Sequence, residues 1–267
     1  MDAKAMIKKA LKINPPVVAR KLTLFLKQKL RESKADGFVL GLSGGVDSST
    51  TAFLCAKAVG AGKVLGVSMP EAGVTDPRDV ADAREVANKL GIGFRVVEIT
   101  PAVLGVRKNL TDFKVGALLP AANIKPRVRM TILYYYANLQ NRLVVGSSNR
   151  SELRAGYFTK YGDGAADVAP LGCLYKTQVV QLAKYLRLPA HIIKKPPSAG
   201  LWRGQTDEAE LGISYEKLDM IYAGLDLGLE PKVISKAIGV KEEEVLRFIE
   251  RERRTAHKLR GPEIPAL

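Results

Sequence analysis

The stretch from Val39 to Ser49, VLGLSGGVDSS, combines residue types that can bind phosphate groups. Its apolar beginning, which ends at Leu42, predicts a strand buried on both faces. Gly44 and Gly45 lack a Cβ, so the backbone can adopt positive φ and turn several N–H groups toward one anion. From Asp47 onward the sequence predicts a helix whose free N–H groups face the same point. The stretch therefore predicts an anion site between a strand and a helix.

A helix dipole alone does not hold a triphosphate, because it contributes only about 0.3–1 kcal/mol, or roughly 2 kcal/mol when partly buried. We therefore expect cationic side chains and a metal ion, and Asp47 in the first helical turn is placed to bind Mg²⁺. The spacing of the glycines matches neither the Walker A loop nor the Rossmann fingerprint. These residues alone leave open a plain turn in which Ser and Asp act only as helix caps.

A second group of charges lies between Ser151 and Lys176, where acids and lysines are interspersed with glycines. Such a segment does not form a packed core element, so its charges must be solvated, paired or bound to a ligand. Lysines neutralise phosphate charge, and Glu152 could join Asp47 on a metal ion. A Mg²⁺-nucleotide site is one interpretation, and a solvated loop with local ion pairs is the other. The charged residues that enter the argument below are Glu152, Lys160, Asp163, Asp167 and Lys176.

The elements that must position these residues alternate between strands and helices. This order predicts an α/β fold with a parallel sheet and right-handed crossovers, in which ligands lie beyond the carboxyl ends of the strands. Both the SGGVDSS turn and the polar turn at Gly146–Arg150 would lie at that edge. Besides the strand and helix around Gly44, we expect strands at Val64–Met69, Phe94–Ile99 and Leu143–Val145, and helices at Pro16–Ser33, Pro77–Leu90, Pro126–Asn141 and Lys241–Arg260.

Two segments without periodic patterns are predicted to be loops. Lys108–Leu119 indicates a mobile loop and carries no recognisable function. Lys195–Glu210 contains the only tryptophan, Trp202, among prolines and glycines, and is typical of a flap over a ligand. A plain connecting loop is the alternative, and Asp207 is expected to open the next helix.

A length of 267 residues predicts one or two domains. We expect a single domain over 1–267, with a helical extension at 1–15 and a C-terminal helix and tail at 241–267. No apolar run approaches the roughly 18 residues of a membrane span, and the first residues do not resemble a signal peptide. Cys55 and Cys173 are isolated, which argues against a disulfide framework or a zinc site. We therefore expect a soluble cytoplasmic protein without membrane contact.

The chain carries a net charge of +15. Such an excess suits nucleic acids or polyanionic small substrates. The basic residues are spread along the chain, however, and neither an RNA-binding module nor a basic-aromatic motif accompanies them. We interpret the charge as a solvated basic surface and do not expect a nucleic-acid partner.

The full SGGVDSS string resembles the PP-loop of the ATP pyrophosphatases, which cleave ATP to AMP and pyrophosphate. Further motifs, in the same order from about Pro16 to Pro262, resemble ammonia-dependent NAD synthetases. The resemblance implies an adenine nucleotide alpha hydrolase-like fold with a five-stranded parallel sheet, whose fifth strand would fall near Val168–Leu171. The motifs are NIKPRVRM at 123–130, VVGSSNRSE at 144–152, GYFTKYGDGAAD at 156–167, PLGCLYK at 170–176, KPPSAGLWRGQTDEAELGISYEKLD at 195–219 and the terminal pair HK.

The reaction that the resemblance implies is deamido-NAD⁺ + ATP + NH₃ → NAD⁺ + AMP + pyrophosphate. The nicotinate carboxylate attacks the α-phosphate, and ammonia then displaces AMP from the adenylated intermediate. Mg²⁺ is the implied cofactor, ATP is a co-substrate, and a homodimer with the substrate site near its interface is the implied assembly. Nothing in the sequence resembles a glutaminase domain, so free ammonia is the expected nitrogen source unless a separate subunit supplies it.

The same resemblance assigns residues to each ligand. ATP phosphates would be bound by Gly41, Leu42, Ser43, Gly44, Gly45, Val46, Asp47 and Ser48, with further ATP contacts from Ser147, Lys176 and Ser198. Deamido-NAD⁺ would be contacted by Arg127, Lys160, Asp167, His257 and Lys258. Mg²⁺ would be held by Asp47 and Glu152. The candidates for a direct part in catalysis are Lys176 and Asp163, of which Asp163 would position ammonia or accept its proton.

Some positions depart from the family pattern or have simpler explanations. Pro126 stands where alanine is usual and could shift the backbone beside Arg127, and Ser147 replaces threonine but keeps the hydroxyl group. Outside the family argument, Arg127 could be merely solvated, and the pair His257 and Lys258 could complement a helix dipole.

Other functions remain possible from the sequence. A tRNA-modifying PP-loop enzyme would need an RNA-binding extension or cysteines, and a GMP synthetase-like enzyme would carry its own motif in place of TKYGDGAAD. A regulatory protein would bind ATP without turnover.

Overall fold

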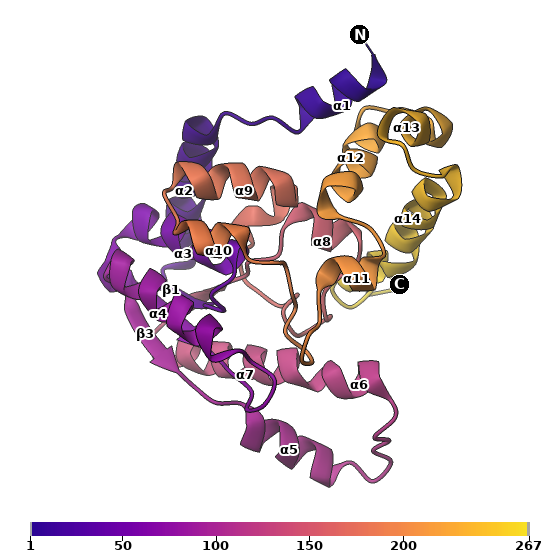
Figure 1. Ribbon diagram of the computed structural model, residues 1–267. Coiled ribbons are helices and arrows are strands. Elements are labelled where there is room, and N and C mark those ends of the chain that lie inside the picture. The colour runs from indigo at the N-terminus through magenta and orange to yellow at the C-terminus, as the bar shows by residue number, and fades with distance from the viewer. Residues whose placement is uncertain (1, 266–267) are drawn as a thin grey trace.

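The structure is a computed structural model that describes residues 2–265, so the last two residues of the predicted C-terminal tail lie outside it. A parallel sheet is surrounded by helices, and a cluster of helices lies beside it (Figure 1). The strands are β1 Gly37–Gly41, β2 Val64–Ser68, β3 Gly93–Val96 and β4 Arg142–Val145. The helices are α1 Ala3–Ala10, α2 Pro15–Ser33, α3 Val46–Val59, α4 Pro77–Leu90, α5 Thr100–Asn109, α6 Leu118–Ala122, α7 Ile124–Leu139, α8 Arg150–Arg154, α9 Lys176–Tyr185, α10 Ala190–Lys194, α11 Asp207–Leu211, α12 Tyr215–Asp226, α13 Pro231–Ile238 and α14 Glu242–Thr255, with 3-10 turns at Ala61–Lys63, Pro170–Cys173 and Ala256–Leu259.

In the strand order β3-β2-β1-β4, the SGGVDSS turn follows β1, the strand on whose two sides the chain places β2 and β4. The chain adds β2 and β3 on one side of β1 and then returns to the other side for β4. All three pairings are parallel, with Val39 opposite both Leu65 and Val144. Ligands of open parallel sheets bind at such a switch point, beyond the carboxyl ends of the strands. The turn after β1 lies there.

The predicted fifth strand near Val168–Leu171 is wrong, because the sheet has four strands among the described residues. Val168 forms one isolated parallel bridge with Val145, and pairing ends there. The Asp167 carboxylate accepts a 2.7 Å hydrogen bond from the N–H group of Val144, which an adjacent strand would otherwise bond through a backbone carbonyl. The chain then turns into a 3-10 helix at Pro170, which has no N–H group to donate.

Apolar side chains cover both faces of the sheet. On one face, α2, α3, α4 and α9 bury a core that includes Leu26, Phe38 and Leu54. On the other face, α5 and α7 pack against side chains such as Val39 and Val67. The central strands β1 and β2 are therefore buried on both sides, as the apolar run that ends at Leu42 predicts for β1, whereas the edge strand β3 is largely exposed.

A second buried cluster joins α1 to α12, α13 and α14 at the opposite end of the sequence. Tyr222 and Phe248 are both fully buried there, with ring centroids 6.2 Å apart in an edge-to-face arrangement. Ala155 and Tyr175 belong to the same cluster, so it adjoins the segment that carries the charged motifs. The single-domain organisation expected from the sequence stays a prediction.

Several local predictions need correction. Lys108–Leu119 is not wholly a loop, since α5 ends at Asn109 and α6 begins at Leu118. The third strand ends at Val96 rather than Ile99, whose N–H group bonds to the carbonyl group of Pro70 beyond β2. The C-terminal helix ends at Thr255 and continues as a 3-10 turn. No helix among residues 2–265 is long and apolar enough to cross a membrane.

The helical cluster makes a testable contribution to stability. Phe248→Ala should lower the free energy of unfolding by about 3–5 kcal/mol, because it removes a fully buried ring and leaves a cavity. Urea unfolding followed by circular dichroism measures the change. Leu246→Ala, at a residue of the same helix that is 48% exposed, is the control and should shift stability by about 0.5 kcal/mol or less. Equal effects of both substitutions would contradict this assignment of the core.

Candidate functional site

The turn after β1 is shaped by a glycine and two serines. Gly44 has φ +78°, and a Cβ there would overlap the backbone oxygen of Asp79 at the start of α4. The hydroxyl groups of Ser43 and Ser48 lie 2.9 Å apart, and the Ser43 N–H group donates to Ser48 Oγ at 3.2 Å. Gly45 at the N-cap of α3 supplies no side-chain cap, so no side-chain oxygen competes with an anion for the N–H groups of the first turn.

A buried group of charges lies beside this turn. The Lys176 ammonium contacts Asp47 Oδ2 and lies 3.9 Å from Glu152 Oε1. Asn149 donates to Asp47 Oδ1 at 3.0 Å and forms a capping box with Glu152 at the start of α8. Three segments thus bring Asp47, Glu152 and Lys176 together, whereas their roles stay predictions. Asn149, which the sequence offered only as part of a polar turn, holds two of the acids in place.

Burial governs the charge state of this group. Desolvation raises the pKa of Glu152 to about 8, repulsion by Asp47 adds to the effect, and Lys176 opposes it. Burial by itself would lower the pKa of Lys176, but the neighbouring carboxylates hold that pKa above its ordinary value. Carboxylate oxygens are suitable ligands for Mg²⁺. A metal ion here would replace or share the contact between Lys176 and Asp47.

A third carboxylate, Asp207, lies near this group and was predicted only as a helix start. Asp207 is 4% exposed, and its Oδ2 accepts a 3.0 Å hydrogen bond from the hydroxyl group of Tyr215. The Tyr215 ring centroid lies 5.1 Å from the Lys176 ammonium. Burial raises the pKa of Asp207, and attraction to Lys176 lowers it. The acidic start of α11 was its only sequence signal.

Asp219 on α12 fixes the positions of two helices that carry members of this charged group. Ser151 Oγ donates to Asp219 Oδ1 at 2.5 Å, and the Thr177 N–H group donates to Oδ2 at 2.8 Å. Ser151 Oγ in turn accepts from the Lys176 N–H group at 2.9 Å. Asp219 therefore ties together the starts of α8 and α9, the helices that carry Glu152 and Lys176.

A basic group lies where the C-terminal segment meets the 156–160 loop. Arg127 Nη2 donates to the Lys160 carbonyl group at 3.4 Å, and Lys160 Nζ donates to the His257 carbonyl group at 2.8 Å. Lys258 Nζ donates to the carbonyl groups of Gly156 and Phe158, at 2.8 and 3.0 Å. The structure therefore brings together four of the five residues predicted to contact deamido-NAD⁺, namely Arg127, Lys160, His257 and Lys258, whereas the fifth, Asp167, bonds to Tyr134 and Val144.

Gly156 makes this approach possible. Its φ is +59°, and a Cβ there would overlap the side chain of Thr255 at the end of α14. Tyr157 connects the basic group with the acidic one, because its hydroxyl group donates to Glu210 Oε2 at 2.5 Å and is also near Asp207. The two groups of charges are therefore joined through α11.

The remaining predicted site residues lie in different settings. Asp163 Oδ1 accepts from the Thr159 N–H group at 2.9 Å within the KYGDG turn. Asp167 is an exposed residue whose carboxylate accepts from Tyr134 as well as from Val144. Ser147 follows β4 and is partly buried, and Ser198 is exposed. Neither serine has a hydrogen bond to the turn after β1 within residues 2–265.

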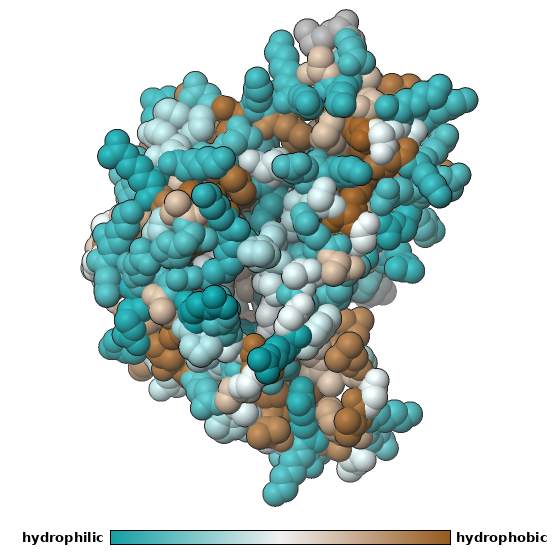
Figure 2. All heavy atoms as spheres, viewed as in Figure 1, coloured by the Kyte–Doolittle hydropathy of each residue, from teal (hydrophilic) through white to brown (hydrophobic). Residues whose placement is uncertain are grey.

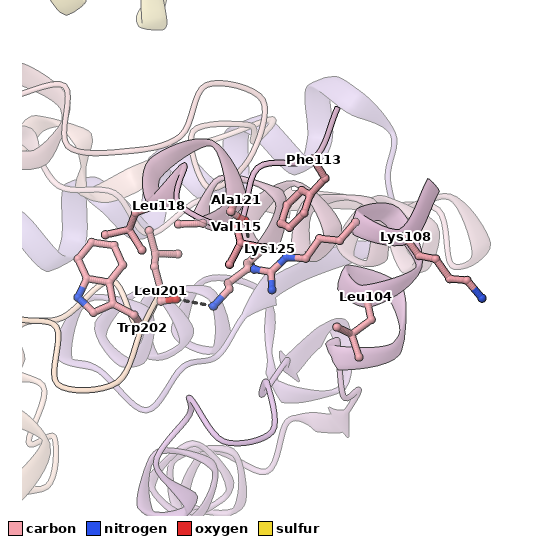
Figure 3. A pocket seen from close by; sticks show the side chains of 11 residues that line it. Leu104, Lys108, Phe113, Val115, Leu118, Ala121, Lys125, Leu201 and Trp202 are labelled. Atoms are coloured by element: carbon pink, nitrogen blue, oxygen red, sulfur yellow. Dashed lines mark hydrogen bonds between the residues drawn. The ribbon is translucent and has the colours of Figure 1, made fainter. Parts of the chain in front are cut away.

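The predicted flap is an irregular segment from Lys195 to Thr206 that runs from α10 toward α7 and returns to α11 (Figure 1). Lys125 on α7 is buried and contacts the Leu201 carbonyl group (Figure 3). The Lys125 ammonium also pairs with Glu71, which follows β2, at 2.6 Å. This ion pair was not predicted from the sequence.

A cavity of about 680 Å³ lies between this segment and α5, α6 and α7. Leu118, Leu201 and Trp202 line one part, and Leu104 and Phe113 line another, with Lys125 between them (Figure 3). The segment Lys108–Leu119, to which the sequence assigned no function, therefore forms a large part of its wall.

The buried position of Asp219 predicts a pH effect on stability. Burial raises its pKa from 3.8 to about 6, although Ser151 and Thr177 lower it. Because the pKa of Asp219 is higher in the folded than in the unfolded protein, its protonated form favours folding. This contribution to the free energy of unfolding is complete below about pH 4 and is lost as pH rises to about 6, by roughly 3 kcal/mol at most. Urea unfolding from about pH 4 to 7 should show wild type losing stability relative to Asp219→Asn. A difference independent of pH would contradict this origin.

Comparisons with known proteins agree with this arrangement. A family model described as NAD synthase matches residues 18–262. The NH(3)-dependent NAD(+) synthetase of Methanocaldococcus jannaschii is 45% identical over 258 residues, 94% of this chain and 96% of its own. That of Thermococcus kodakarensis is 48% identical over 242 residues, 90% of this chain and 93% of its own.

Two solved structures extend the similarity to the fold. The NMN synthetase of Francisella tularensis has a TM-score of 0.84 at 36% identity, covering 96% of this chain and 100% of its own. The NH3-dependent NAD synthetase of Campylobacter jejuni, in complex with the nitrate ion, has a TM-score of 0.80 at 31% identity, covering 95% and 100%. On the matched family model and these identities, the chain belongs to the NAD synthase family.

Proposed function

We propose that this protein amidates deamido-NAD⁺ with ammonia, consuming ATP and releasing NAD⁺, AMP and pyrophosphate through an adenylated intermediate. The observation that supports it most is the juxtaposition of the turn after β1, the acids around Lys176 and the basic group at Lys160 and Lys258. The first two match what ATP cleavage needs, and the third can bind the phosphates of the dinucleotide substrate.

Each part of this arrangement has a task in the reaction. The N–H groups at the start of α3 and the Lys176 ammonium stabilise the negative charge that develops on the departing pyrophosphate. Arg127 and Lys160 hold deamido-NAD⁺ so that its carboxylate reaches the α-phosphate. Asp163, fixed by Thr159, positions ammonia or accepts its proton in the second step.

Asp47 and Glu152 are the proposed ligands of Mg²⁺. Both present carboxylate oxygens beside the turn after β1. The Lys176 side-chain ammonium group, which contacts Asp47 and lies 3.9 Å from Glu152, indicates that this position favours a cation. When bound, Mg²⁺ neutralises phosphate charge and orients the leaving group. Ser147 and Ser198 are proposed to contact ATP once the nucleotide is bound.

The acceptor is proposed to be the dinucleotide, although a mononucleotide is the second candidate. The Francisella tularensis relative is an NMN synthetase, so the corresponding acid mononucleotide deserves a direct comparison. Its identity to this chain is 36%, whereas that of the NAD(+) synthetase from Methanocaldococcus jannaschii is 45%. The higher identity supports deamido-NAD⁺.

The decisive assay supplies Mg-ATP, ammonium and one acceptor at a time, and measures AMP and the amide product. NAD⁺ and AMP should form in equal amounts with deamido-NAD⁺, and much less product with nicotinic acid mononucleotide, xanthosine monophosphate or tRNA. If no AMP forms with deamido-NAD⁺, the proposed reaction is overturned. If nicotinic acid mononucleotide is the better substrate, it is the acceptor in place of deamido-NAD⁺.

The same assay tests the metal site. Glu152→Gln should lower turnover at least about tenfold and shift the required Mg²⁺ concentration upward, because outer partners of metal ligands already contribute 10–100-fold. Glu243→Gln, at an exposed residue in the first turn of α14, is the matched control and should behave as wild type. An unchanged Mg²⁺ requirement in Glu152→Gln would exclude this ligand.

We also propose that the protein is a homodimer and acts in the cytoplasm. Apolar side chains gather on the surface over α5 and α6 (Figure 2). Exposed apolar residues that cluster in this way are typical of protein interfaces. Both cysteines are free, as is usual in a reducing compartment. The α5–α6 surface is defined by Leu104, Leu110, Val115, Leu118 and Leu119, whose exposed fractions range from 48% to 89%.

The dimer has its own test. Leu110→Asp combined with Leu119→Asp should give a monomer in light scattering after size exclusion, because burying two carboxylates in an apolar interface is costly. Leu24→Asp, at an α2 residue that is 55% exposed, should leave the dimer intact. A wild-type monomer, or a dimer that survives the double substitution, would rule out this interface.

A further inference from the structure

Lys195 connects three parts of the molecule and has no role in the reaction described above. It lies directly after α10, at the base of the Lys195–Thr206 segment. Its ammonium is 2.8 Å from Asp79 Oδ1, contacts Asp82 Oδ2 and donates to the Gly44 carbonyl group at 3.3 Å. One cation therefore links the irregular segment, α4 and the turn after β1.

The two aspartates lie unusually close to the proposed phosphate site. The missing Cβ of Gly44 allows the Asp79 backbone into contact with the turn, and the Cβ of Asp82 would be 3.1 Å from a Cβ at that position. Two carboxylates beside a loop that receives a triphosphate would repel it, and this repulsion is strong when the charges are partly desolvated. Lys195 is the cation that contacts both of them.

Two further basic side chains lie near these acids, but both are more exposed than Lys195. His191 on α10 lies 3.3 Å from Asp82 Oδ1 and 3.2 Å from Glu85 Oε2, and its side chain is 53% exposed. Arg78 pairs with Asp76 and is 86% exposed, so solvent screens it. The Lys195 side chain is 26% exposed and is the group that also reaches the turn after β1.

We propose that Lys195 is a positioning residue of the ATP site. Its ammonium neutralises Asp79 and Asp82 beside Gly44 and fixes the base of the Lys195–Thr206 segment against the turn after β1. The phosphates of ATP then enter a site without excess negative charge, under a segment that is already in place. This inference rests on the proposed function for the identity of the nucleotide.

The test measures ATP binding and catalysis separately. Trp202 is the only tryptophan and lies in the same segment, so its fluorescence during Mg-ATP titration reports binding without turnover. Lys195→Met should raise both the apparent Kd and the KM for ATP about tenfold. Hydrogen bonds to charged groups contribute free energies that correspond to a change of about this factor in an equilibrium constant. The KM for deamido-NAD⁺ should change less than about twofold.

Two further variants separate charge neutralisation from a general structural effect. Lys195→Arg should stay within about threefold of wild type, because it keeps the cation. Lys195→Met combined with Asp82→Asn should recover part of the lost affinity, because one of the unneutralised carboxylates is removed. Lys194→Met, at the preceding exposed lysine, is the control and should match wild type.

Two results would overturn the inference: wild-type ATP affinity in Lys195→Met, or no recovery in the double variant. Should Lys195→Met fail to fold, the ATP affinities of Lys195→Arg and of the double variant are compared. The double variant, in which Asp79 has lost its cation, should bind ATP more weakly, and equal affinities would overturn the inference. A wild-type protein that binds Mg-ATP but forms no NAD⁺ would refute the proposed function, whereas the fluorescence titrations would still test Lys195.

Discussion

The site depends on the pairing of the buried Lys176 ammonium group with Asp47 and Glu152. A cation removed from water must be paired, and its partners come from segments that are distant in the sequence. Asp47 follows β1, and Glu152 follows β4, so the pairing requires both strands to be in register. Asp219 then holds the two helices that carry Glu152 and Lys176. Removing one partner would leave an unpaired buried charge, which is far more costly than losing a surface ion pair.

The sheet and its helices convert this local requirement into an architecture. Parallel strands place their carboxyl ends at one edge, so polar turns after different strands meet there. The helical cluster around Phe248 brings the C-terminal segment to the 156–160 loop, where Lys258 donates to two backbone carbonyl groups. Parts of the chain that are distant in sequence thus meet at one site.

Local sequence patterns predicted the elements of the fold well where periodicity or turn chemistry was strong. The helix over Pro77–Leu90 is confirmed to the residue, with Asp76 as its cap, since a capping side chain and an N-terminal proline define that boundary. The fifth strand was wrong because the Asp167 side chain replaces a backbone acceptor, and no local pattern records such a substitution. The 3-10 turn at Pro170 ends the pairing for a similar reason.

For the site, the motif residues were predictable and their supporting contacts were not. Asn149, Asp207 and Asp219 act through tertiary hydrogen bonds, which depend on how helices pack rather than on spacing along the chain. Lys125 illustrates the same limit, because its burial beside Glu71 joins α7 to the end of β2. A lysine in a helix-forming sequence normally predicts a solvent-exposed side chain, so only the folded structure reveals a buried ion pair of this kind.

The order of the strands also has a consequence for synthesis. β2 and β3 follow β1 closely in the chain, but Gly37 finds its partner Arg142 only after α4, α5, α6 and α7 have been made. During synthesis, the backbone groups on the β4 side of β1 therefore have no strand partner until β4 has been made, whereas β2 and β3 are made earlier. Until then this side of β1 is an unpaired strand edge, which is a template for pairing with other chains.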